Sequence, residues 1–204
     1  CIRDRYMETL NGPADWKQAE VPRSPITGTV FENAAASKMV HIVEFTADLL
    51  KHNKIKLDKS RNKGIKATFH DSCNPARAMG ILEEPRYVLQ NAVEDFKEMP
   101  ENTIREQTFC CGGGAGLGTD ENMEMRLRGG LPRGNAVKHV HDKFGVNRLV
   151  AMCAIDRATL TTVCEYWAPK VNVSGIHELV SNALICKGEK KREQNLRLEP
   201  IGEV

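Results

Sequence analysis

The sequence predicts an α/β fold, a Rossmann-like parallel sheet flanked by helices. Two observations predict it. Short apolar and β-branched runs alternate with amphipathic helical runs between residues 64 and 185, which is the pattern of βαβ units. Hydrophobic residues make up 41% of the 204 residues, and this is enough for a buried core.

The strands are expected where short apolar runs end in polar, glycine-rich or cysteine-containing segments. The first of them, Gly64–Phe69, leads directly into His70-Asp71-Ser72-Cys73. The expected strands are 64–69, 106–110, 148–153 and 170–173.

The helices are expected where apolar residues recur at helical spacing after a start signal. Asn74 is expected to cap a helix with Pro75 in its first position. Thr119, followed by two acids, starts another helix, which the glycines and proline of 129–132 should interrupt. The other expected helices are 37–52, the run after Glu84-Pro85, 135–144, 157–167 and 176–185.

Composition narrows the function classes. A net charge of +2, without a concentrated basic face, does not predict nucleic-acid binding. No run approaches the roughly 20 apolar residues that cross a bilayer, so no direct membrane span is expected. Seven scattered cysteines favour metal or redox use in a reducing compartment over a disulfide framework.

Four cysteines follow expected strands, in the array C-x36-CC-x41-C-x-x-D: Cys73, Cys110, Cys111 and Cys153. The carboxyl ends of parallel strands share one edge of a sheet, where ligands bind, so these side chains should converge there. The alternative for any one of them is a small buried hydrophobic residue. That interpretation is applied to Cys164 and Cys186, which lie in apolar helical runs.

The adjacent pair Cys110-Cys111 points to a particular kind of centre. Structural zinc sites favour C-x2–4-C pairs, which the sequence lacks. Iron–sulfur ligation tolerates dispersed thiolates, and Gly112 and Gly113 allow backbone N–H groups to approach the sulfurs. A GxGxxG fingerprint is absent from the glycine run, which argues against a nucleotide site.

A short repeat suggests duplicated units. Cys1-x-x-Asp4-Arg5 matches Cys153-x-x-Asp156-Arg157, and a helical run that begins with histidine follows each copy. We therefore expect residues 1–36 to be the tail of a first unit with a connection, 37–187 a complete second unit, and 188–204 a polar tail. The chain begins with Cys1 and not Met, as expected of a piece of a longer polypeptide.

The segments His70–Arg77 and Phe109–Gly114 resemble the first-cysteine and middle motifs of the cysteine-rich CCG domain of heterodisulfide-reductase-type proteins. That pattern is C-x(n)-CCG-x(n)-C-x-x-C and usually occurs twice. From Lys38 to Glu199 the chain also resembles the K subunit of the Dsr membrane complex of sulfate- and sulfite-metabolising prokaryotes.

The resemblance implies a non-cubane [4Fe–4S] cluster held by Cys73, Cys110, Cys111 and Cys153. Asp156 stands where the family pattern has its last cysteine, and two interpretations remain open. It binds an iron or leaves that iron open to substrate sulfur, or it caps the helix that follows. His70 is either a proton donor or a histidine bonded to nearby backbone.

The resemblance further implies the catalytic subunit of an oxidoreductase complex, reducing a disulfide or trisulfide on a DsrC-like sulfur carrier protein. Expected partners include a membrane-anchored quinone-interacting subunit, which would place the chain on the cytoplasmic face of the membrane. One alternative is electron transfer without disulfide chemistry, in another membrane redox complex or an organic-acid oxidoreductase. The other is a metal-free interaction protein.

Overall fold

The computed structural model describes residues 23–31, 40–114 and 116–186. In that part of the chain, four strands form one parallel sheet in the order β2-β1-β3-β4. The strands are β1 Lys66–Phe69, β2 Asp95–Phe96, β3 Arg148–Ala151 and β4 Asn172–Gly175. The expected α/β fold with a parallel sheet is confirmed.

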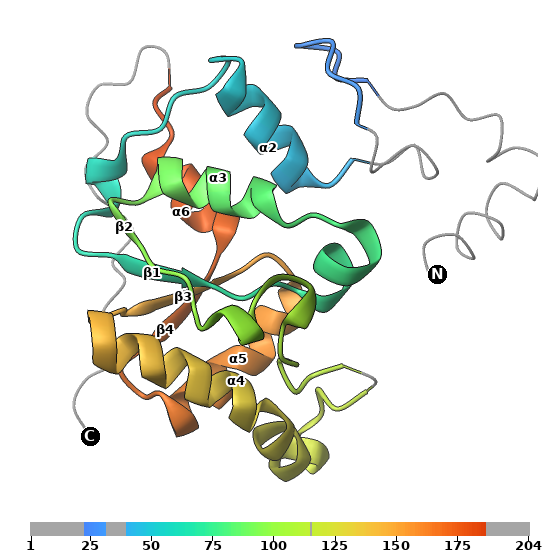
Figure 1. The fold of residues 1–204 in the computed structure, drawn as a ribbon, viewed down its shortest axis with the longest axis vertical. Coiled ribbons are helices and arrows are strands. Elements are labelled where there is room, and N and C mark those ends of the chain that lie inside the picture. Colours follow the sequence, from blue (N-terminus) through green and yellow to red (C-terminus); the bar gives the residue numbers. More distant parts are fainter. Residues whose placement is uncertain (1–22, 32–39, 115, 187–204) are drawn as a thin grey trace, which may run out of the picture.

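The helices form a layer on each side of the sheet (Figure 1): α2, α3 and α6 cover one face, and α4 and α5 cover the other. Their bounds are α2 Ile42–Lys51, α3 Glu83–Ala92, α4 Met123–Phe144, α5 Ala154–Trp167 and α6 Ile176–Ala183. No helix in the described ranges combines the length and apolarity needed to cross a membrane.

Alternation along the central strands explains why both layers are needed. Phe69 and Val150 pack into the core under α2, α3 and α6, whereas Leu149 and Ala151 pack against α4 and α5. All four side chains are fully buried. A strand buried on both faces is typical of parallel sheets covered by crossover helices. With both faces covered, a ligand can reach the sheet at the ends of its strands.

The expected strand at 106–110 is wrong. Residues Arg105–Gln107 form a 3₁₀ turn, and the strand beside β1 is the shorter β2. The backbone carbonyls of Glu106 and Thr108 accept hydrogen bonds from the Arg77 guanidinium, at 2.8 and 2.6 Å. Side-chain donors therefore satisfy groups that a sheet ladder would otherwise pair.

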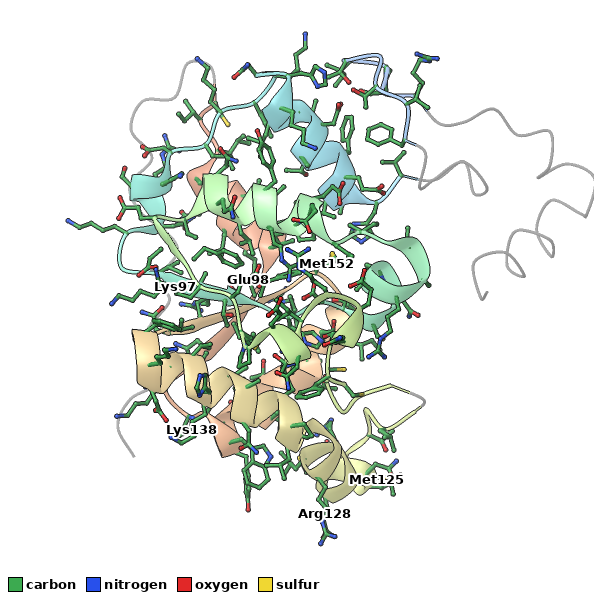
Figure 2. The ribbon with its side chains drawn as sticks, viewed as in Figure 1. Lys97, Glu98, Met125, Arg128, Lys138 and Met152 are labelled. Carbon is green, nitrogen blue, oxygen red and sulfur yellow. The ribbon has the colours of Figure 1, made fainter. Side chains whose placement is uncertain are left out.

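The expected break in the helix at 129–132 is also wrong, because α4 runs without interruption through Pro132. A Cβ on Gly130 would lie 2.5 Å from Val163 Cγ2, and one on Gly134 would lie 2.6 Å from Trp167 Cβ. The glycines thus allow α4 and α5 to pack closely. On the outer side of α4, Arg128 projects into solvent (Figure 2).

Several smaller expectations need correction. Asn74 does not cap a helix: it opens a single π-helical turn, Asn74–Ala78, with Cys73 in the cap position. Helix α5 starts at Ala154, earlier than expected, and β4 lies two residues later along the chain than expected. Cys186 is exposed and lies beyond α6, so it is not a buried helical residue.

The repeat that suggested duplication rests partly on Cys1, Asp4 and Arg5, which lie outside the described residues. The polar tail 188–204 and most of residues 1–36 lie outside them too. Duplication and the three-part division of the chain therefore stay predictions.

Candidate metal centre

Two of the four candidate cysteines follow neighbouring strands. β1 and β3 pair in parallel with Phe69 opposite Val150, so Cys73 and Cys153, which come shortly after these strands, leave the sheet at the same edge. Cys73 is exposed and Cys153 is half-buried. Cys153 occupies the cap position of α5, which places it at the start of that helix.

The Cys110-Cys111 segment reaches this edge through polar contacts and not through a strand. Thr108 Oγ1 donates a 2.8 Å hydrogen bond to the Asp71 carbonyl, and the Arg105 backbone N–H donates one of 2.7 Å to the Asp71 carboxylate. The segment is therefore bound to the turn that follows β1, the same turn that carries Cys73.

Asp71 is itself held by a buried ion pair. Arg86 Nη1 and Nη2 donate to its two carboxylate oxygens at 2.7 and 2.8 Å, and both side chains are almost fully buried. This bidentate geometry is the strongest arrangement for an arginine–carboxylate pair. Glu98 also accepts a hydrogen bond from Arg86. The guanidinium therefore joins α3 to the turn after β1, which carries Asp71, and to the segment after β2, which carries Glu98.

Asp156 points into the site. It lies within the first turn of α5, where no side-chain cap is made, so the helix-cap interpretation is wrong. Its Oδ2 lies 3.6 Å from His70 Nε2, and the residues are only 3% and 1% exposed. The interpretation of His70 as a backbone-bonded histidine is not supported either, since its Nδ1 has no partner among the described residues.

The charge state of this pair follows from its surroundings. Burial lowers the pKa of His70, and Asp156 opposes this only in part, so His70 is neutral near pH 7. Burial alone would raise the pKa of Asp156, but the polar groups of His70, Ser72 and Cys111 beside it bring that pKa below its usual value. The site therefore holds a buried carboxylate.

The two adjacent cysteines differ in exposure but share one backbone feature. Cys110 is exposed and Cys111 is buried. The Gly112 N–H donates to Cys110 Sγ at 3.3 Å, and the Gly113 N–H donates to Cys111 Sγ at 3.4 Å. The expectation that these glycines bring N–H groups to the sulfurs is confirmed. Burial raises the pKa of Cys111 to about 12, with Thr159 and Asp156 as neighbours.

Both positions after the cysteine pair require glycine. Gly112 has a φ of +87°, and a Cβ there would lie 2.5 Å from the Arg126 carbonyl oxygen. A Cβ on Gly113 would lie 2.1 Å from Thr159 Cγ2. The glycines therefore let the segment turn tightly against α4 and α5 while their N–H groups face sulfur.

Arg133 is a site residue that the sequence analysis missed. Its side chain is fully buried, its Nη2 donates to the Thr103 carbonyl at 2.6 Å and to Thr108 Oγ1 at 2.9 Å, and its guanidinium lies over the Phe109 ring. Burial lowers its pKa to about 10, so it remains a cation. The sequence did contain a signal for its burial, because Arg133 lies on the apolar face of α4.

The site has buried polar atoms that the described residues do not satisfy: His70 Nδ1, Ser72 Oγ and Asp156 Oδ2. Such atoms are rare unless another group pairs with them. No three His, Cys, Asp or Glu side chains in the described ranges gather closely enough for a single metal ion. Cysteine thiolates are the donors that iron–sulfur groups take, so the residue types at this edge fit such a group.

Comparison with known proteins finds relatives over nearly the whole chain. An Hdr-like menaquinol oxidoreductase iron-sulfur subunit 2 from Archaeoglobus fulgidus is 48% identical over 98% of this chain and 39% of the relative. A similarly named subunit from Archaeoglobus profundus is 42% identical, with the same coverage. This chain is a relative of Hdr-type iron–sulfur subunits.

A shorter Hdr-type match supports the relationship. One polypeptide of the dihydromethanophenazine:CoB--CoM heterodisulfide reductase of Methanosarcina mazei is 41% identical over 80 residues, which are 39% of this chain and 19% of that protein. The chain spans about two fifths of the length of its Archaeoglobus relatives. No family model matches the chain, and no solved structure matches it.

Proposed function

We propose that this Hdr-type chain binds an iron–sulfur cluster at the carboxyl edge of its sheet and transfers electrons within a larger redox complex. The ligands are Cys73, Cys110, Cys111 and Cys153. The observation that carries the proposal is the pair of backbone N–H groups donating to Cys110 and Cys111, because such donors stabilise reduced, negatively charged iron–sulfur centres.

The cluster type belongs to the proposal as well. The CCG motif resembles that of proteins with a non-cubane [4Fe–4S] cluster, which supplies one-electron chemistry at sulfur when bound. The chain's own residues prepare the site around it. Gly112 and Gly113 donate hydrogen bonds to sulfur, Thr159 closes the space beside Gly113, and Arg133 places a buried cation under the segment.

His70 and Asp156 have proposed roles on the buried side of the site. Asp156 either binds iron or leaves one iron without a protein ligand, and its carboxylate lies beside Cys111. His70 carries a proton next to that carboxylate. Because His70 is 1% exposed, it serves the interior of the site, while the exposed Cys73 and Cys110 mark the side that a partner can reach.

The proposed reaction is reduction of a disulfide or trisulfide carried by a small sulfur-carrier protein of the DsrC type. A disulfide takes up two electrons and two protons and gives two thiols. The electrons come from a redox partner in the complex. Resemblance to the Dsr K subunit supports this finer proposal.

A second candidate is electron transfer linked to a quinone, without disulfide chemistry. The Archaeoglobus relatives are named for menaquinol oxidoreductase complexes, and an EtfAB:quinone oxidoreductase from Syntrophomonas wolfei is 37% identical over 79 residues. In either case we propose a membrane-anchored quinone-interacting partner subunit, which holds this chain against the membrane.

Electron paramagnetic resonance distinguishes the two candidates. Oxidised protein is mixed with trisulfide-loaded carrier, and the disulfide proposal expects a new paramagnetic signal that the Cys110→Ser variant lacks. A signal unchanged by the carrier but altered by a reduced quinol partner supports the quinone-linked candidate and counts against direct sulfur chemistry.

A further inference from the structure

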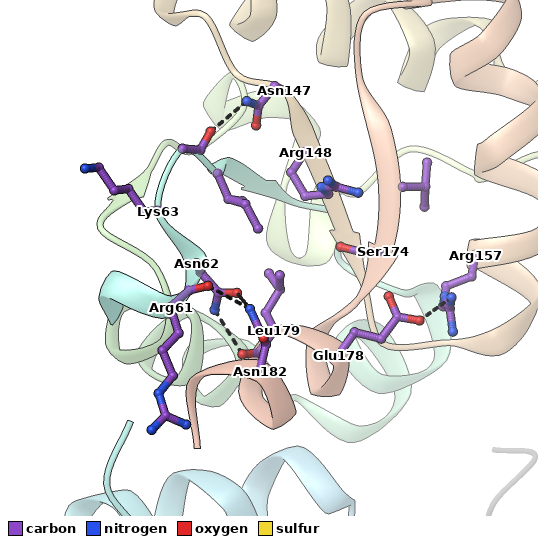
Figure 3. Close-up of a pocket in the computed structure, with 13 residues that line it drawn as sticks. Arg61, Asn62, Lys63, Asn147, Arg148, Arg157, Ser174, Glu178, Leu179 and Asn182 are labelled. Atoms are coloured by element: carbon purple, nitrogen blue, oxygen red, sulfur yellow. Dashed lines mark hydrogen bonds and ion pairs between the residues drawn. The ribbon is translucent and has the colours of Figure 1, made fainter. Parts of the chain in front are cut away.

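A pocket whose lining contains none of the candidate cysteines lies beside β4 (Figure 3). Its volume is about 700 Å³, and its described lining contains no cysteine. The walls come from the turn before β1, the start of β3, strand β4 and helix α6. Pockets of this size hold a small organic ligand with a few placed polar groups.

The lining is strongly basic. Arg61, Lys63, Arg148 and Arg157 line the pocket, against a single acid, Glu178. Glu178 is already paired with Arg157, and Arg61 donates to the Leu184 carbonyl and lies near Asp58. The pocket therefore keeps an excess of positive charge that its own acid does not balance.

Arg148 is the unusual member of this set. It is only 8% exposed, and its Nε has no hydrogen-bond partner among the described residues. Ser174 is 2% exposed, and its Oγ is unpartnered in the same part of the chain. Buried polar atoms without a hydrogen-bond partner are costly, so a ligand that bonds to them gains accordingly.

The strand register brings these two groups to one side of the sheet. Arg148 lies opposite Asn172 and Val150 lies opposite Ser174 in the β3–β4 pair. Residues two apart on a strand share a face, so Arg148 and Ser174 project together towards α6. Figure 3 shows both side chains in the pocket with no contact drawn to either.

The pocket walls are already formed. Asn62 Nδ2 donates to the Ala92 and Leu179 carbonyls at 2.8 and 3.0 Å, and Asn147 bonds the backbone of Gly64 and Lys66. These amides are engaged in holding the backbone and need no ligand. A preformed wall reduces the ordering cost of binding.

We propose that this pocket binds a small organic anion whose carboxylate or phosphate pairs with the Arg148 guanidinium and accepts from Ser174. Lys63 adds positive charge at the pocket. Ile65 and Leu179 line the same space and contact the apolar body of the ligand. The site stands apart from the cluster edge and does not depend on the cluster proposal.

Calorimetric titration of the purified protein with benzoate, phenyl phosphate and uncharged benzyl alcohol tests this pocket. At least one anion should bind while benzyl alcohol does not, and the preferred anion identifies the head group. Arg148→Met should weaken that binding about tenfold or more, as expected when a charged hydrogen bond is lost. The exposed Arg128→Met variant is the matched control and should bind like the parent.

Absence of binding by both anions, or equal binding by the parent and Arg148→Met, overturns the proposal. A second readout is thermal unfolding. The preferred anion should raise the melting temperature of the parent protein and not that of Arg148→Met. Equal shifts in the two proteins also overturn the proposal. Ser174→Ala, a smaller change, should weaken anion binding while the fold is retained; unchanged affinity counts against the site.

Discussion

His70 Nε2 lies 3.6 Å from Asp156 Oδ2, and the two side chains are almost completely buried. The pair joins the end of β1 to the first turn of α5 and places a carboxylate beside the Cys111 thiol. Asp156 stands at the position where the resembling CCG motif has a cysteine. The central question is therefore what this carboxylate does to the cluster we propose.

Asp156→Asn should retain iron and shift the reduction potential to a more positive value. Removing a negative charge near a cluster makes the added electron more favourable. The measurement is a redox titration followed by electron paramagnetic resonance. An unchanged reduction potential would show that the carboxylate charge does not act on the cluster. Complete loss of iron would identify Asp156 as an essential ligand.

Cys110→Ser should abolish the iron–sulfur absorbance of the anaerobically purified protein, because a ligand thiolate is lost. Cys164→Ser is the matched control: Cys164 is 1% exposed within α5 and packs in the apolar core with Leu160 and Val137. Its replacement should leave the absorbance intact. Equal loss in the two variants would contradict the ligand assignment.

Gly113→Ala should destabilise the protein by about 1–3 kcal/mol, the usual cost of forcing extra volume into a packed site. The new Cβ would lie 2.1 Å from Thr159 Cγ2, a branched side chain fixed within α5. Gly114→Ala, with nothing within 4 Å of its Cβ, should be close to neutral. Thermal unfolding at equal iron content compares them, and similar melting temperatures would contradict the close contact.

Asp71→Asn should destabilise the protein by about 3–5 kcal/mol, because it leaves the buried Arg86 guanidinium without its bidentate partner. It should also loosen the Cys110-Cys111 segment, since the Asp71 carboxylate accepts a hydrogen bond from the Arg105 backbone N–H. Glu124→Gln, at an exposed pair with Arg128 on α4, should change stability little. Chemical denaturation measures the two changes, and equal effects would contradict this role of Asp71.

The sheet was predictable because apolar runs, separated by helical periodicity, identify buried parallel strands. The edge position of Cys73 and Cys153 followed from that alone. The location of Cys110 and Cys111 was also anticipated, but for a wrong reason. Thr108 and Phe109 have strand-forming side chains, yet Arg77 and Asp71 satisfy the backbone and side chain there, and no local pattern reveals such long-range partners.

Three further features depended on tertiary contacts. Gly130 and Pro132 suggest a helix break locally, whereas the close approach of Val163 to Gly130 favours a continuous α4. Arginine is usually a surface residue, but Arg133 is fully buried, because Thr103 and Thr108 accept its hydrogen bonds. Asp156 was recognised as a candidate, but its burial beside His70 becomes evident only in the folded chain.

Iron and acid-labile sulfide quantification on anaerobically purified, folded protein tests the central claim most directly. We expect about four irons and about four sulfides per chain, with the visible absorbance lost in Cys110→Ser and retained in Cys164→Ser. A folded protein that carries no iron after anaerobic reconstitution would contradict a cluster at the Cys73, Cys110, Cys111 and Cys153 edge.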